Sequence, residues 1–309
     1  MSEKITLSGV PETMLQTVYA RAKESSGRGA IRDRKAEETI GGLQYDFSMA
    51  DRDKAMHSGV IARTIVLDRL TGAWLQEHPG GTVVNVACGL DTRCYRMEGY
   101  GRWYNLDLPE TIVVRQRLLP ENGAISQIAM SAMDDWGGEI KGTSTDVLVI
   151  IEGLTMYLSE SDVKRIFDII AARFDRATVL VETMNPMVVK RFKEKSIEAS
   201  KAKFTWGVKN GAALAALTGR EAIDIDARIA EKAGCSIPEI FAKGGEAAFR
   251  ALEREATAAC GALSGKLLLT GGGVVKTPEN YAALHQNGRI YQLLRPLELL
   301  PTDGRPLSQ

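Results

Sequence analysis

The stretch Thr82-Val83-Val84-Asn85-Val86-Ala87-Cys88-Gly89-Leu90-Asp91-Thr92-Arg93 decides the fold. Apolar and β-branched residues lead into a turn of small residues, and an aspartate then opens a predicted helix. In a doubly wound α/β sheet the first strand delivers such a turn, and a nucleotide-type ligand lies across the carboxyl end of that strand. We therefore expect this stretch to hold a cofactor.

Length and charge limit the class of protein. The chain has 309 residues, enough for one large α/β domain or two smaller ones. Its 39 basic and 39 acidic side chains give a formal net charge of zero, so no overall field attracts nucleic acid or an anionic membrane. It has no apolar run long enough to span a bilayer and no signal-peptide core at its N-terminus. We expect a cytoplasmic protein with no nucleic-acid or membrane partner; the sequence is silent on oligomeric state.

Cysteine and histidine usage argues against a metal centre. The four cysteines form no C-x-x-C pair, and the three histidines lie far apart in the sequence. We predict no metal site and no disulfide framework. There is also no G-x-S-x-G elbow, the commonest signature of the α/β-hydrolases.

Strand and helix signals alternate along the first two thirds of the chain. Val147 to Ile151 is an uninterrupted apolar run, which is typical of a strand covered on both faces. Ser159 and Asp162 have capping-box spacing and start a helix. The other predicted strands are the opening one, 102–107, 125–130 and 178–181, and the other predicted helices are 11–24, 57–77 and 110–119. This order predicts a mainly parallel sheet with right-handed crossovers.

The turn favours one class of cofactor over another. Asp107 ends the second strand 18 residues beyond Gly89, and an acid there accepts hydrogen bonds from ribose hydroxyls in either class. A dinucleotide site needs G-x-G-x-x-G, because the backbone closely approaches a pyrophosphate. Here residues 87–92 contain one glycine and place Asp91 where the phosphates would sit. S-adenosylmethionine has no phosphate and carries a sulfonium cation, so the turn predicts a methyl donor.

Several blocks, in order and spacing, resemble the leucine carboxyl methyltransferases and the related bacterial polyketide O-methyltransferases. The resemblance covers roughly residues 10 to 217. Its blocks are Val84 to Arg93 with Tyr95-Arg96, Ala62-Arg63-Thr64, Asn105-Leu106-Asp107-Leu108-Pro109, Ile151 to Leu158, and Phe204-Thr205-Trp206-Gly207. The family turn usually reads Gly-Ala-Gly, and here it reads Ala87-Cys88-Gly89.

The resemblance implies a set of site residues for S-adenosylmethionine. Arg63 and Lys35 would hold the methionine carboxylate, for which a guanidinium fork is suited. Asp107 would hold the ribose beside Gly89. Three further positions are implied to line the cofactor pocket, Ser131 and Asp134 near the adenine and Glu152 near the methionine end. Tyr157 and Arg96 are candidates for orienting a small-molecule acceptor. Methyl transfer is an in-line displacement that relies on alignment and needs no metal.

The last hundred residues resemble a different enzyme. From about residue 212 to 309 the chain is similar to shikimate kinase, in blocks around 222–229, 237–250, 269–273 and 303–307. By that resemblance the substrate site would contain Asp226, Arg250, Gly271, Gly272, Gly273 and Arg305, with Asp224 near a magnesium ion. The phosphate loop G-x-x-x-x-G-K-[ST] is absent, however, and the backbone and lysine of that loop bind the nucleotide. We therefore expect no ATP turnover.

The predicted fold class is thus α/β: a Rossmann-like S-adenosylmethionine-dependent methyltransferase sheet over residues 1–211, then a partial P-loop-kinase-like α/β segment over 212–309. Predicted strands at 222–225, 266–269 and 289–294 finish the first sheet, form a second lobe or stay poorly packed. Three functions remain open: an O-methyltransferase acting on a carboxylate or hydroxyl, a catalytically silent ligand-binding fusion protein, and a shikimate-type kinase. The sequence does not distinguish a natural fusion from a recombinant one.

Overall fold

The computed structural model describes residues 10–120, 123–141, 146–191, 204–219, 221–263, 266–271 and 273–286. The chain divides into two compact units, residues 1–209 and 210–309. Each unit has its own sheet and its own core. The strand predicted at 289–294 lies outside the described residues.

The first unit is built on a parallel sheet of five strands. They run in the order β3-β2-β1-β4-β5, with β1 in the centre. Val86 at the end of β1 pairs with Leu106 of β2 and Ile151 of β4, so the carboxyl ends of these strands lie level. The strands are β1 Thr82–Val86, β2 Arg102–Asp107, β3 Ile125–Ala129, β4 Val147–Ile151 and β5 Ala177–Val181. The predicted parallel α/β sheet is confirmed.

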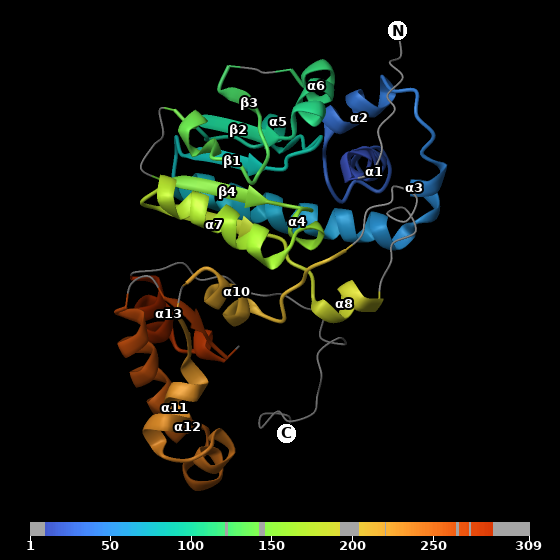
Figure 1. Ribbon diagram of the computed structural model, residues 1–309. Helices are drawn as coiled ribbons and strands as arrows, with labels where there is room; N and C mark the ends of the chain where they lie inside the picture. Colours follow the sequence, from blue (N-terminus) through green and yellow to red (C-terminus); the bar gives the residue numbers. More distant parts are fainter. Residues whose placement is uncertain are drawn as a thin grey trace. The chain divides into compact units, whose positions relative to one another are not determined.

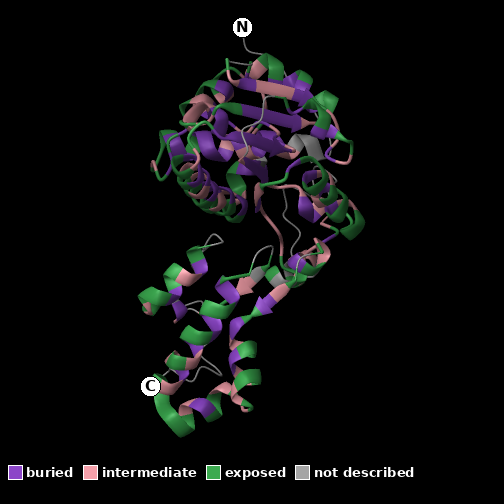
Figure 2. Cartoon of the chain, turned by 90° about the vertical axis from the view of Figure 1, so that its left-hand side faces the viewer, coloured by how far each residue is buried: buried purple, intermediate pink, exposed green. Residues whose placement is uncertain are grey.

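Helices bury both faces of this sheet. Every residue of β1 and β4 is buried, as the apolar runs predicted (Figure 2). On one face the core contains Ile166 and Ile170 of α7 (Glu160–Arg173), and on the other Leu67 and Trp74 of α4 (Lys54–Glu77). The helix α7 begins with the predicted capping box, in which Ser159 and Asp162 satisfy each other's backbone N–H groups.

Shorter helices complete the first unit. Figure 1 shows α1 beyond the carboxyl ends of the strands, where its residues pack on Leu90 of the turn. Pro109 occupies the first turn of α6, where its fixed φ and missing N–H suit a helix start. The remaining elements are α1 Val10–Ser26, α2 Arg34–Gly41, α3 Ser48–Arg52, α5 Arg93–Arg96, α6 Pro109–Leu118, η1 Trp136–Glu139, η2 Thr155–Tyr157 and α8 Pro186–Arg191.

The second unit pairs its own strands. Strands β6 and β7 form a two-stranded parallel sheet. Of the three arrangements that the sequence left open, these two strands therefore form the second lobe and do not join the first sheet. Its core contains Ile223, Ile229 and Phe249. Gly245, at φ 66°, kinks the long helix α12. Its elements are α10 Gly211–Leu217, β6 Ala222–Asp224, α11 Ile225–Ala233, α12 Ile237–Gly261, β7 Leu267–Leu269, η3 Val274–Lys276 and α13 Pro278–His285.

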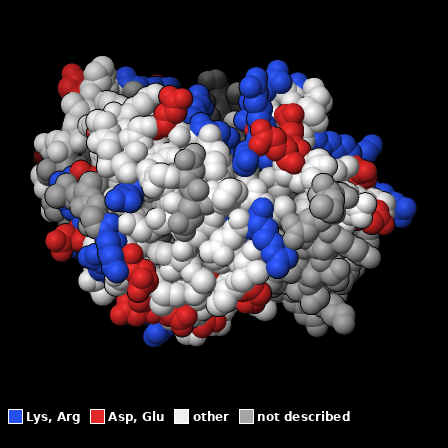
Figure 3. Space-filling model, turned by 90° about the horizontal axis from the view of Figure 1, so that it is seen from above, with Lys and Arg blue, Asp and Glu red and all other residues white. Residues whose placement is uncertain are grey.

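The surface charge is mixed. Basic and acidic side chains both occur on the face of the molecule in Figure 3, in keeping with a formal net charge of zero. Within the described part of the chain, no helix is both long and apolar enough to cross a membrane.

Candidate active site

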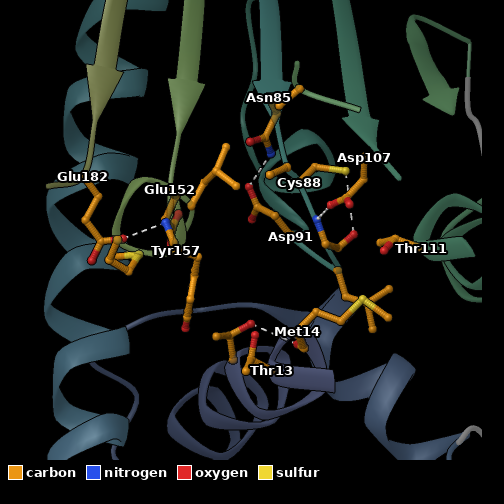
Figure 4. A pocket seen from close by; sticks show the side chains of 18 of the residues that line it. Thr13, Met14, Asn85, Cys88, Asp91, Asp107, Thr111, Glu152, Tyr157 and Glu182 are labelled. Carbon is orange, nitrogen blue, oxygen red and sulfur yellow. Dashed lines mark hydrogen bonds between the residues drawn. The ribbon is translucent and has the colours of Figure 1, made fainter. Parts of the chain in front are cut away.

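A cavity of about 460 Å³ opens at the carboxyl ends of the strands of the first unit. Its wall combines the turn after β1, residues after β2 to β5, and residues of α1 and α4. In Figure 4, Glu152, Tyr157 and Glu182 lie on one side, Asp107 and Thr111 on the other, and α1 contributes Thr13 and Met14 below. A ligand crossing the strand ends would touch both sides, as the topology of such sheets requires.

The turn has an unusual backbone. Ala87 has φ 53° and Gly89 has φ 47°, so both occupy the left-handed region, which disfavours residues with a Cβ. A Cβ on Gly89 would lie 3.0 Å from the Cβ of Met14 in α1. The Asn85 side chain donates to Asp91 Oδ2 at 2.8 Å and fixes that carboxylate at the cavity. Burial raises the pKa of the Cys88 thiol, which keeps it protonated.

Asp107 is held by backbone groups. Its two oxygens accept from the N–H groups of Gly89 and Leu108, each at 2.7 Å. Burial nevertheless raises the pKa of Asp107 above its ordinary value, since desolvation outweighs these hydrogen bonds. The carboxylate lies next to the glycine that lets a ligand approach the backbone.

On the opposite side, Arg63 of α4 joins two strand-end acids. Its Nε donates to Glu152 Oε1 at 2.8 Å and its Nη1 to Glu182 Oε1 at 3.3 Å. Glu182 also accepts from the Gly153 N–H at 2.7 Å. Burial opposes the charge on Arg63, but the carboxylates of Glu182 and Glu152 raise its pKa above the ordinary value. The guanidinium therefore stays charged at the cavity.

Buried arginines lie behind these acids. Arg93 is 1% exposed and binds Asp68, Asp91 and Glu152 at 2.7 to 3.0 Å. Although burial opposes it, the charges of Arg93 and Arg63 hold the pKa of Glu152 below its ordinary value. Glu152, which faces the cavity, is thus held ionised from behind.

The structure brings together most of the residues predicted for the cofactor and the acceptor. Six of them line the cavity, namely Arg63, Gly89, Asp107, Ser131, Glu152 and Tyr157. Three others are not among its lining residues. Lys35 pairs with Glu38 at 3.0 Å, Arg96 binds Asp68, and Asp134 accepts from the Ser131 N–H. Their side chains are already paired, so the geometry does not assign them a place in the cavity wall.

Several lining residues were not predicted from sequence. Glu182 had a signal, since it ends a predicted strand as Asp107 does. The α1 residues Thr13, Met14 and Thr17 had none, because their place depends on how the helix packs. An apolar wall completes the cavity, made of Met56, Val60, Leu154, Met156, Leu158, Met184 and Phe204.

The second unit brings together part of the predicted shikimate-like set. A Cβ on Gly271 would lie 3.4 Å from Asp226 Oδ2, and one on Gly273 would lie 2.6 Å from Arg250 Nη2. Arg250 is ion-paired with Glu246 and Glu253 of its own helix, at 3.1 and 2.7 Å. Asp224 caps α11 by accepting from the Asp226 and Ala227 N–H groups. Gly272 and Arg305 lie outside the described residues.

The sheet order and the cavity at the strand ends define a Rossmann-like α/β enzyme fold. The chain belongs to the leucine carboxyl methyltransferase family, whose model matches residues 15–171. The tetracenomycin polyketide synthesis O-methyltransferase TcmP of Streptomyces glaucescens is 34% identical over 219 residues, covering 68% of this chain and 79% of that protein. The predictions of an S-adenosylmethionine-dependent methyltransferase and of its cofactor are confirmed at the level of the family.

The second unit has a different likeness, as predicted. Residues 209–304 match the shikimate kinase family model. The shikimate kinase of Geobacter sulfurreducens is 43% identical over 90 residues, covering 29% of this chain and 50% of that enzyme, so the chain spans about half of the kinase's length.

Among solved structures, the chain is similar to a putative methyltransferase from Thermobifida fusca. The match covers 62% of this chain and 75% of that protein's chain, with 14% identity and a TM-score of 0.41.

Proposed function

We propose that the cavity binds S-adenosylmethionine and transfers its methyl group to a carboxylate or hydroxyl of a small, natural-product-like acceptor. The observation that carries this proposal is the position of Asp107, a buried carboxylate beside Gly89 at the end of β2. A carboxylate there accepts hydrogen bonds from both ribose hydroxyls. In this proposal, residues 1–211 form the methyltransferase domain and residues 212–309 a partial kinase-like segment.

The charges of the cavity fit this donor. Its described lining includes four acids and two arginines; the acids are Asp91, Asp107, Glu152 and Glu182, and the arginines are Arg21 and Arg63. An excess of carboxylates opposes a pyrophosphate and favours a ligand with sulfonium and ammonium cations. The residues present therefore fit S-adenosylmethionine better than a dinucleotide.

Each end of the donor has candidate partners. At the methionine end, Arg63 would hold the carboxylate, and Glu152 would accept from the ammonium group. At the other end, Asp107 would hold the ribose and Ser131 would lie near the adenine, with Met133 against the ring. S-adenosylmethionine supplies a methyl carbon that its own sulfonium activates.

The protein's part in the reaction is alignment and exclusion of water. The apolar wall that includes Met156, Met184 and Phe204 would pack against the acceptor and keep it dry. Tyr157 would orient the acceptor oxygen through its hydroxyl. A carboxylate acceptor is already a nucleophile, so this arrangement needs no strong general base.

Calorimetric titration of the full chain with S-adenosylhomocysteine tests the donor site. We expect binding that weakens by about tenfold or more in D107N, because an amide is a poorer acceptor for two hydroxyl donors. The matched control is D168N, whose aspartate is exposed on α7 and pairs with Lys164. Equal binding by D107N and the unaltered chain, or no binding by either, would count against the proposal.

The acceptor is found with a methyl-labelled donor and a panel of small acids and phenols. A product that releases labelled methanol in dilute base is a methyl ester, and one that resists base is an ether. Donor binding with no transfer to any member of the panel would favour the catalytically silent alternative. Shikimate and ATP in the same assay test the kinase alternative, for which the sequence has no phosphate loop.

A further inference from the structure

Arg115 of α6 has different partners from the other buried arginines near the cavity. Its side chain is fully buried. Its Nη1 donates to the Gly89 carbonyl at 2.9 Å and its Nη2 to Cys94 Sγ at 3.5 Å, and its Nε has no partner among the described residues. The described carboxylates form ion pairs with Arg21, Arg63, Arg93 and Arg96, but none with Arg115.

This burial is unfavourable in itself. Removing a charged group from water is strongly unfavourable unless a hydrogen-bonded counter-ion compensates it, and even buried ion pairs can often be replaced by apolar residues without loss of stability. A carbonyl, a thiol and an unsatisfied Nε offset little of that cost. The stability of the fold therefore does not explain a guanidinium at this position.

Gly89 connects Arg115 to Asp107 by hydrogen bonds. Its N–H donates to Asp107 Oδ2 at 2.7 Å, and its carbonyl accepts from Arg115 at 2.9 Å. Thr111, one turn earlier on α6, lies on the same side of the cavity as this carboxylate (Figure 4). Through Arg115, the helix α6 thus fixes the glycine that in turn holds the acid.

Several titratable groups surround Arg115 and Asp107, and of these groups Asp107 is the one whose change of charge would affect ligand binding. Asp107 faces Arg115 from α6 and Cys88 from the turn, and Arg115 also faces Cys94, Tyr95 and Asp91. Burial raises the pKa of both thiols and raises that of Tyr95 to about 12, so these three groups stay protonated near neutral pH. Burial raises the pKa of Asp107 too, and the charge of Arg115 opposes that rise.

We propose that Arg115 is a positioning residue for the methyl donor: it fixes the Gly89 carbonyl and so holds the glycine whose N–H orients the Asp107 carboxylate toward the ribose hydroxyls. This inference rests on the proposed function, since it takes Asp107 to be the ribose acceptor. Arg115 acts through Gly89 and through its charge, and it is not among the residues that line the cavity.

The test is the pH profile of S-adenosylhomocysteine binding, measured by calorimetry on the full chain from pH 5 to 9. In R115Q the pKa of Asp107 rises further, so we expect the affinity to fall at low pH and recover as the pH increases. The midpoint of the profile should move up by about one pH unit, which is about tenfold in affinity at acid pH. The thermal midpoint should be unchanged or higher. R117Q, an exposed arginine on the same helix, is the control.

Other variants separate charge from shape. R115K keeps the positive charge, so the midpoint of its pH profile should equal that of the unaltered chain, even if its affinity for S-adenosylhomocysteine is lower. D107N should bind weakly at every pH, with or without R115Q. The proposal is overturned if R115Q loses affinity equally at all pH values or not at all. If R115Q does not fold, R115K decides alone, and a shifted profile in R115K overturns the proposal.

Failure of the proposed function gives a different result. In that case the unaltered chain binds no S-adenosylhomocysteine, or D107N binds it as tightly as the unaltered chain does. Either result removes the ribose acceptor on which the role of Arg115 depends.

Discussion

Arg63 and Arg93 share the carboxylate of Glu152, one on each oxygen. Arg63 Nε lies 2.8 Å from Oε1, and Arg93 Nη2 lies 3.0 Å from Oε2. Arg63 faces the cavity and Arg93 is buried behind it, so Glu152 links the wall of the site to the interior. An acid in this position both orients the cavity arginine and neutralises the buried one.

E152Q should therefore weaken both the fold and donor binding. An amide keeps one acceptor oxygen but leaves Arg93 with less compensation, so we expect a loss of about 1 to 3 kcal/mol in the free energy of unfolding. S-adenosylhomocysteine affinity should fall as well, because Arg63 loses its fixed orientation. Urea unfolding and calorimetry measure the two effects. E139Q, an exposed acid in η1, is the control and should change neither; unaltered unfolding of E152Q would contradict the structural role.

The left-handed backbone at Ala87 predicts a stabilising substitution. A residue with a Cβ at φ 53° pays about 1 to 2 kcal/mol of steric cost that glycine avoids. Glycine loses more backbone entropy on folding, which offsets part of this gain. We expect A87G to raise the free energy of unfolding by about 0.5 to 1 kcal/mol, measured by urea unfolding.

The matched control for A87G is A62G, at an exposed position in the middle of α4. There the same change should destabilise the protein by about 1 kcal/mol, because the backbone is helical and glycine is a poor helix former. Destabilisation of similar size in both variants would show that the turn is not strained.

Strand ends and capping boxes were predictable because their signals are local. The all-apolar run of β4 and the Ser159–Asp162 box are read from neighbouring residues. The pairing of Gly89 with Asp107 followed from their spacing across one βαβ unit, since strand ends in a parallel sheet lie together.

The role of charged helix residues was not predictable in the same way. Arg115 and Arg117 look alike in sequence, yet the first is fully buried and the second exposed, and only packing distinguishes them. Lys35 and Arg96 were predicted for the site, but nearby acids pair with both of them outside the cavity wall. Such pairing depends on the competing partners that folding brings close.

Lowering the pH should reduce the free energy of unfolding, because Asp91 becomes protonated. Burial opposes the charge of this carboxylate, but Arg93, Arg96 and Arg21 outweigh burial and hold the pKa of Asp91 well below its usual range. A depressed folded-state pKa contributes stability above the unfolded pKa of about 3.9, and this contribution is lost as the pH falls through the folded value. D91N removes that contribution. We therefore expect the free-energy difference between D91N and the unaltered chain to be largest at pH 7 and to shrink below about pH 4.

Urea unfolding of both proteins at a series of pH values measures this difference. D168N, with an exposed carboxylate, should show the same pH dependence as the unaltered chain. A constant difference between D91N and the unaltered chain at every pH would mean that Asp91 acts through shape alone.

The labelling rates of the cysteine thiols can show where the ligand binds, without an assay of methyl transfer. Cys88 lines the cavity, is 5% exposed and has a raised pKa because of its burial, so an aromatic disulfide reagent should label it slowly at pH 8. Cys235 is the one partly exposed cysteine and should react first, while Cys94 and Cys260 are buried. S-adenosylhomocysteine should slow the labelling of Cys88 further, since a ligand against the turn covers it, and leave Cys235 unchanged. Peptide mapping by mass spectrometry assigns each labelled cysteine. In C88A the kinetic phase of labelling that the ligand slows should be absent, which identifies it as the reaction of Cys88. Labelling of Cys88 at the same rate with and without saturating ligand would place the ligand away from this turn.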